Sequence, residues 1–161
     1  MNQFPMLARF NQWANERLYD TCAKLPDGER RRDRKAFFGS IHNTLNHLLV
    51  VDRLWIGRME GAEPGIKSLD QVLYDAFDAL RAARRKEDER LIGFVDGIPE
   101  NRLETTVSYR RMSEPRTPQT KPIHVLLITL FNHQTHHRGQ VHTMLSQAGI
   151  DPPALDIINF V

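Results

Sequence analysis

One stretch constrains the fold of this chain more than any other: residues 126–145, LLITLFNHQTHHRGQVHTML, hold four of the seven histidines. An α-helix advances about 100° per residue, so residues three and four apart share a face. His133 and His137 are in phase with an apolar set at this spacing, which consists of Leu126, Leu130, Val141 and Met144. The stretch therefore predicts an amphipathic helix that turns two histidines toward a core.

The other two histidines of the stretch lie off that face. His136 is in phase with polar residues, and His142 is out of phase with His133 and His137. Neither is therefore expected to be a metal ligand. Imidazoles at i and i+4 lie about 6 Å apart along the axis, and both rings can converge on one ion. Burying two unpaired titratable rings is costly. The pair alone still leaves two interpretations open, a metal site and a hydrogen-bonded pair in the core.

A second helix is predicted from about Ser40, a suitable N-cap, to Met59. On this helix His47 lies among apolar residues and is expected to face the core, whereas His42 shares a polar face and is expected to point outward. Together with the inward pair, His47 becomes the natural third ligand. Three protein ligands leave positions open for water or substrate, as in catalytic rather than structural metal sites.

Two further helices complete the pattern. One is predicted over residues 4–25, with Cys22 buried on its apolar face. Another is predicted to begin at a capping box that starts at Ser68 and to end near residue 95. Four long amphipathic helices joined by loops predict an all-α four-helix bundle, in a single domain that spans residues 1–161.

Smaller features accompany the helices. Residues 103–110 alternate as a short strand that could pair as a hairpin before the last long helix. The many charges along residues 81–90 are interpreted as a solvated surface. Gly139, inside a helix, indicates the close approach of another backbone. Four apolar residues of the tail are expected to be buried, namely Leu155, Ile157, Ile158 and Phe160.

Charge and hydropathy exclude several partners. The net charge is only +2, and the basic run at residues 30–35 has no interleaved aromatic residue, so no nucleic-acid partner is expected. No apolar run approaches the roughly 20 residues that span a bilayer, and no signal-peptide pattern opens the chain. We therefore expect a cytoplasmic protein without membrane contact. The single cysteine excludes an internal disulfide.

Three blocks of the sequence resemble a known family. They are SIHNTLNHLLVVDRLWIGRM at 40–59, LFNHQTHHRGQVHTML at 130–145 and the closing GIDPPALDIINF. These blocks are similar to the DinB family of damage-inducible-type four-helix bundle proteins, which is related to the YfiT-like metalloenzymes. The resemblance implies an up-down-down-up bundle, a homodimer and a three-histidine site for a divalent metal ion. Its ligands fall on His47, His133 and His137, the three that helical phase selects.

The resemblance also implies a class of chemistry. Characterised relatives include thiol-dependent transferases and isomerases that use bacillithiol, mycothiol or glutathione, as well as metal-dependent hydrolases. We expect a metal-dependent enzyme with a small-molecule substrate, in the first place a low-molecular-weight thiol that takes part in S-transferase-type chemistry. The alternatives are a metal-dependent hydrolase and a noncatalytic, metal-stabilised binding protein. Three nitrogen ligands favour zinc or nickel, with iron or manganese as alternatives.

Three polar residues near the predicted site have less definite roles. Asp52 is expected either to orient a ligand histidine or to pair with an arginine such as Arg138. Arg138 and Gln140 flank the histidine pair and could contact an anionic substrate, although a surface position is the simpler expectation for both. No protein side chain is assigned as catalytic, because the sequence carries no recognisable nucleophile and base; a metal-bound water or thiol takes that role.

Overall fold

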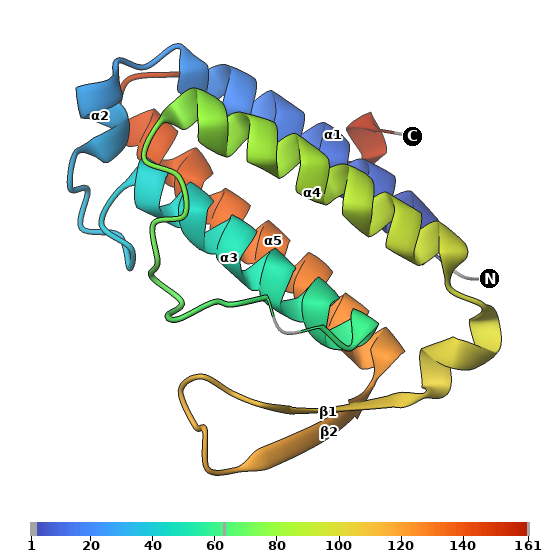
Figure 1. Ribbon diagram of the computed structural model, residues 1–161. Coiled ribbons are helices and arrows are strands. Elements are labelled where there is room, and N and C mark those ends of the chain that lie inside the picture. Colours follow the sequence, from blue (N-terminus) through green and yellow to red (C-terminus); the bar gives the residue numbers. More distant parts are fainter. Residues whose placement is uncertain (1–2, 63, 161) are drawn as a thin grey trace.

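The computed structural model describes residues 3–62 and 64–160 and consists mainly of four long helices, α1 (Phe4–Ala23), α3 (Ile41–Glu60), α4 (Phe77–Gly97) and α5 (Ile123–Gln147) (Figure 1). Short elements connect them, namely α2 (Asp27–Arg31), η1 (Glu100–Glu104), β1 (Thr106–Arg110), β2 (Pro118–Pro122) and, in the tail, η2 (Ile157–Asn159). The predicted all-α class with a small hairpin before the last long helix is confirmed. None of the described helices is both long and apolar enough to cross a membrane.

Local chemistry sets the ends of α3, the helix that carries His47. The Ser40 hydroxyl accepts a hydrogen bond from the backbone N–H of Asn43, as an N-cap does. At the other end, Gly61 adopts a φ of +75°, a left-handed conformation that glycine reaches without steric cost. Both ends agree with the sequence prediction to within one residue.

The helix that follows begins later than predicted. Residues 68–76 form turns and irregular backbone, and α4 starts only at Phe77. Instead of capping a helix, the Gln71 side chain accepts a hydrogen bond from the backbone N–H of Lys67. Residues 64–76 therefore form a crossover segment that returns along the bundle toward the start of α4 (Figure 1).

Two apolar clusters show how the helices run. One cluster joins the C-terminal part of α1 to the N-terminal parts of α3 and α4 and the C-terminal part of α5. The other joins the opposite parts of the same four helices. The helix α1 therefore runs parallel to α5 and antiparallel to α3 and α4, as Figure 1 also shows. Helix α5 packs against α3, which brings the two histidine-bearing helices together.

Between the two apolar clusters lies a layer of buried polar side chains, which we call the polar layer. Each of the four long helices contributes to it, and its members are Asn11, Asn15, Asp52, Arg84, Asp88, Gln134 and Arg138. The prediction of a solvated surface for residues 81–90 is wrong for Arg84, Glu87 and Asp88, which are at most 5% exposed. These residues share the face of Leu80, Ala83 and Leu91, so helical phase outweighs their charge.

A two-stranded antiparallel hairpin closes one end of the bundle. In its register Thr106 lies opposite Pro122 and Arg110 lies opposite Pro118. Val107 and Tyr109 turn to the bundle and pack against the second apolar cluster. The hairpin thus extends the core past the C-terminal end of α3.

Two smaller predictions are wrong. A side chain at Gly139 would meet nothing within 4 Å, so no neighbouring backbone approaches there. In the tail, Ile157 and Ile158 are 38% and 77% exposed. Leu155 packs against the core, and Phe160 packs against Phe10 and Trp13. The tail docks through two of its four apolar residues because the short η2 turn directs the other two outward.

Candidate metal centre

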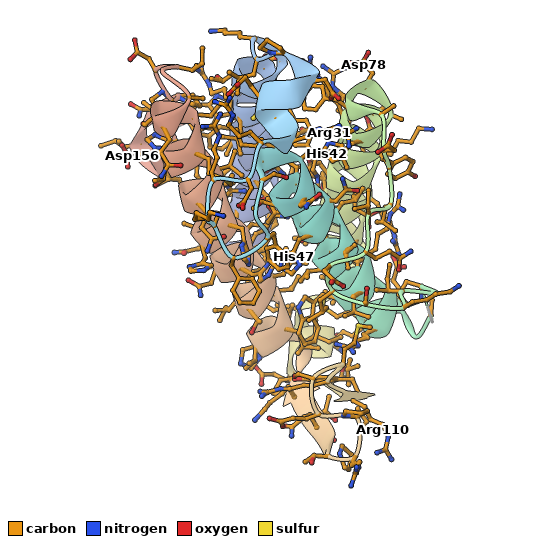
Figure 2. All side chains as sticks on the ribbon, turned by 90° about the vertical axis from the view of Figure 1, so that its left-hand side faces the viewer. Arg31, His42, His47, Asp78, Arg110 and Asp156 are labelled. Carbon is orange, nitrogen blue, oxygen red and sulfur yellow. The ribbon has the colours of Figure 1, made fainter. Side chains whose placement is uncertain are left out.

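The three histidines selected from the sequence lie together where α3 packs on α5. His47 comes from α3, and His133 and His137 come from successive turns of α5. One ring nitrogen from each lies within 4.8 Å of the other two. The Nε2 atoms of His47 and His133 are 3.0 Å apart. Figure 2 shows His47 near the middle of the long dimension of the molecule.

Hydrogen bonds fix which nitrogen of two rings faces the centre. The Nδ1–H of His47 donates to the Leu69 carbonyl at 2.7 Å, and the Nδ1–H of His137 donates to Gln140 Oε1 at 2.8 Å. In a neutral imidazole a protonated Nδ1 leaves a lone pair on Nε2. Both rings therefore present Nε2 lone pairs to the centre, the arrangement in which outer partners orient metal-bound histidines. His133 Nδ1 is buried and has no hydrogen-bond partner among the described residues.

Burial keeps all three rings neutral. It lowers the pKa of His133 to about 3, with a further contribution from the neighbouring histidines. It also lowers the pKa of His137 to about 4, although the hydrogen bond that this ring donates to Gln140 acts in the opposite direction. Burial also lowers the pKa of His47. Neutral imidazole is the form that binds a metal ion. At neutral pH the cluster is thus a set of three uncharged nitrogen donors.

The donor set fits one divalent ion. Two nitrogens that bind a common zinc ion at about 2.0–2.1 Å in tetrahedral directions lie about 3.3 Å apart, close to the 3.0 Å between His47 and His133. Among the described residues, no carboxylate or thiolate joins the three histidines. His47, His133 and His137 could therefore hold an ion and leave positions for other ligands.

An aromatic loop covers one side of the cluster. The Phe38 ring stacks on His47 with centroids 3.9 Å apart and lies 5.6 Å from the ring of His137. The loop turns through Lys35 and Gly39, which have φ values of +58° and +77°. Its neighbour Phe37 is 84% exposed. Phe38 therefore shields two of the three rings from water while the adjacent side chain stays in solvent.

The prediction that His42 points outward is wrong. His42 is 1% exposed, and its Nε2 lies 3.2 Å from Asn46 Nδ2. The Asn46 Oδ1 accepts from the backbone N–H groups of Leu73 and Tyr74, so the crossover segment covers this face of α3. Burial, with the nearby charge of Arg31, lowers the pKa of His42. The side chain of His42 lies near Arg31 and apart from His47 (Figure 2), and His42 does not belong to the histidine cluster.

The histidines set aside on α5 lie outside the cluster. His136 is exposed, with its Nε2 3.2 Å from Gln140 Nε2, and His142 is half-buried. His124, at the start of the same helix, contacts the Leu103 carbonyl at 3.2 Å. The phase argument therefore separates the inward pair on α5 correctly from its neighbours.

Of the two roles predicted for Asp52, the pairing with an arginine is confirmed. The arginine is Arg84, however, and not Arg138. An Arg84 nitrogen lies 2.7 Å from Asp52 Oδ2, and a second lies 3.0 Å from Asp88. Gln134 also donates to Asp52. Arg138, expected at the surface, is 4% exposed and donates to Asn11 and Asn15. It is buried because it shares the inward face of α5 with Gln134 and Val141.

Three partners of the cluster were missed in the sequence. The Leu69 carbonyl reaches His47 only because the crossover segment is not helical there. Gln140 is expected at the surface from the sequence, although its spacing of three residues from His137 places the two side chains on one helical face. Phe38 lies in a loop, and no periodic pattern predicts where such a ring packs.

Acid is expected to destabilise the metal-free protein through this cluster. In the unfolded chain His133 and His137 regain a pKa near 6.5, whereas in the folded chain they take up protons only near pH 3 and 4. Between these limits the unfolded chain binds more protons, so the free energy of unfolding falls as pH drops below about 6.5. We expect a loss of about 1 kcal/mol per ring between about pH 7 and pH 5, after allowance for solvent screening. Urea unfolding in the presence of a chelator measures it.

A double variant, His133→Gln with His137→Gln, is the control for this prediction. Asp52 acts in the opposite direction, because burial raises its pKa to about 6 and the folded chain takes up that proton first as pH falls. The Asp52 contribution is present in both proteins and cancels in the comparison. Equal pH slopes in the two proteins would contradict the assignment to the histidines.

Comparisons with known proteins agree on one family. The model of the DinB family matches residues 1–161. Protein DinB of Bacillus subtilis (strain 168) is 25% identical over 150 residues, which cover 89% of this chain and 84% of that protein. A solved DinB-like protein from Bacillus cereus ATCC 10987 superposes with a TM-score of 0.67 at 19% identity, over 88% of this chain and 90% of the other. One from Bacillus subtilis gives 0.68 at 15% identity, over 94% and 98%.

Proposed function

The chain belongs to the DinB family, and from this membership and the histidine cluster we propose that it is a metal-dependent enzyme whose single divalent ion is held by His47, His133 and His137. The observation that carries the proposal is the convergence of three neutral imidazoles, two of them with Nδ1 held by an oxygen acceptor. A structural zinc site is normally closed by four protein ligands. Three ligands favour a site at which a substrate can bind.

When bound, a divalent ion would lower the pKa of a coordinated water or thiol, so that hydroxide or thiolate is available near pH 7. The chain's own residues prepare the site for this. Leu69 and Gln140 hold the protons of His47 and His137 on Nδ1, away from the centre. The Phe38 ring excludes water from one side.

A small cavity lies next to Gln140, and none of the three histidines lines it. This cavity of about 210 Å³ lies between α5 and the loop at residues 34–37. Gln140, the partner of His137, forms part of its wall, as do Met144 and the exposed Phe37. A substrate in this cavity would thus contact a residue that directly orients one of the proposed ligands.

For the reaction we propose thiol-dependent S-transfer. A low-molecular-weight thiol would release its proton to solvent, its sulfur would form a bond to an electrophilic carbon, and the leaving group would depart with the electrons of the broken bond. The uncharged nitrogen donors support this choice, because they leave the ion its full positive charge to stabilise a thiolate. Zinc and nickel both suit a site that combines imidazole and thiolate ligands.

The test supplies the metal-loaded protein with an electrophile and, in turn, bacillithiol, mycothiol and glutathione. We expect turnover with at least one thiol, lost on chelation and restored by added metal. A parallel panel of esters and amides is run on the same protein. Hydrolysis without thiol transfer would replace the proposed reaction by a hydrolase, and no metal-dependent turnover on either panel would contradict catalysis at this centre.

A further inference from the structure

A second and larger cavity lies away from the histidines, at the hairpin end of the bundle. It measures about 840 Å³ and opens between the C-terminal end of α3, the hairpin and three residues that follow α3, namely Gly61, Ala62 and Ile66. Figure 2 shows Arg110, one of its lining residues, at the lower end of the molecule, away from His47 near the middle. Ligand cavities commonly measure about 300–1,000 Å³. This space is therefore large enough for a small organic molecule.

The described charged residues that line the cavity are all arginines. Arg58, Arg110 and Arg111 line it, and no acidic residue does so among the described residues. The C-terminal end of α3 also faces the cavity and contributes a partial negative charge of about half an elementary charge. Three guanidinium groups outweigh that contribution, so the local potential favours an anion.

One of the arginines is already held in place. The Arg58 guanidinium lies 4.9 Å from the ring centroids of both Trp55 and Tyr109, and it donates to the Arg110 carbonyl at 2.6 Å. Its planar group is thus fixed between α3 and β1 before any ligand arrives. A guanidinium held in this way loses little rotamer freedom when it binds a carboxylate or phosphate.

The other two arginines, Arg110 and Arg111, differ from Arg58 in the contacts that their guanidinium groups make. Arg110 donates to the carbonyls of Pro115 and Arg116 and so orders the hairpin loop. Arg111 is exposed, and its guanidinium has no hydrogen-bond or ion-pair partner among the described residues. Arg111 can therefore turn toward a ligand without breaking an existing contact.

The remaining wall is largely apolar. Leu54, Ile66, Met112 and the ring of Tyr109 line the same cavity. Apolar walls with a few convergent polar groups are typical of small-molecule sites. The chemistry of the wall fits a ligand with an anionic head group and an apolar body.

The cavity is separate from the histidine cluster. Arg58 follows His47 by eleven residues on α3, a rise of about 16 Å. We propose that the cavity at the hairpin end is a second binding site, which takes a small organic anion with an apolar body and places its head group between Arg58 and Arg111. Binding there does not require the metal ion.

The test titrates two probes of nearly the same shape into metal-free and metal-loaded protein. One is 8-anilinonaphthalene-1-sulfonate, an aromatic anion, and the other is N-phenyl-1-naphthylamine, which lacks the sulfonate. We expect the anion to bind at one site per chain in both forms of the protein and more tightly than the neutral probe. Displacement by 1-naphthoate or by 1-naphthyl phosphate then shows which head group, carboxylate or phosphate, is preferred.

Three single-residue variants test whether the anionic probe binds in this cavity. Arg58→Gln and Arg111→Gln should each raise the Kd for the anionic probe about fivefold, the effect of losing one partly exposed charge pair. Arg85→Gln is the matched control, because Arg85 is exposed on α4 and does not line this cavity. Arg111→Gln breaks no contact that the structure shows, so it remains informative if Arg58→Gln fails to fold. Equal affinity for both probes, or equal loss in all three variants, would overturn the proposal and leave the metal centre untouched.

Discussion

Replacing His133 with Ala is expected to reduce bound metal from about one ion per chain to a level near zero after desalting, and His47→Ala and His137→Ala should do the same. Each change removes one of only three donors, and the described residues offer no carboxylate or thiolate in the cluster to take its place. Elemental analysis of protein purified without an affinity tag measures the result.

The controls separate loss of a ligand from loss of fold. His142→Ala changes a half-buried histidine on the same helix and should keep the metal. Gln140→Leu should keep it with affinity weakened about 10- to 100-fold, because His137 loses the partner that orients it. Added metal should raise the melting temperature of the wild type and of His142→Ala, but not of His133→Ala. Stoichiometric metal in His137→Ala would show that this ring is not a ligand.

The largest effect on stability is expected from Arg84→Met. Arg84 is 2% exposed and lies within 3.0 Å of both Asp52 and Asp88, which are equally buried. Its loss leaves two buried carboxylates without the cation they share. Breaking such a buried pair costs about 3–5 kcal/mol. Urea unfolding at neutral pH should show the free energy of unfolding lowered by this amount.

The neighbouring Arg85→Met provides the comparison. Arg85 is exposed on the same helix, so its loss should change the free energy of unfolding by no more than about 0.5 kcal/mol. The deficit of Arg84→Met should shrink on acidification to about pH 5, because the unpaired carboxyls of the folded chain then take up protons and become neutral. Equal stability of the two variants, or a deficit that grows with acid, would contradict the role given to the polar layer.

A charge pattern proved a weaker guide to burial than helical phase. Arg84 and Asp88 belong to a dense charged run, which suggested solvent, yet both lie in the same phase as Leu80 and Leu91. Burial of these charges is tolerated because the polar layer pairs them across helices. The sequence shows the phase of each residue on its own helix, whereas the partner on another helix is visible only after folding.

The homodimer implied by the resemblance stays a prediction. So does the assignment of the metal ligands, which rests on spacing, burial and family membership together. Sedimentation analysis addresses the first, and the histidine variants address the second.

Local periodicity alone predicted that the chain forms four long helices, although not where α4 begins, and that His47, His133 and His137 face inward. These properties follow from the 3.6-residue repeat, which links positions a few residues apart along one chain segment. The tertiary structure decided what depends on distant segments: the crossover that buries His42 and supplies the Leu69 carbonyl, the ring of Phe38 over His47, and the pairing of Asp52 with Arg84. Contacts of this kind depend on how distant helices and loops pack, and no pattern within a single helix encodes the groups that another segment brings to it.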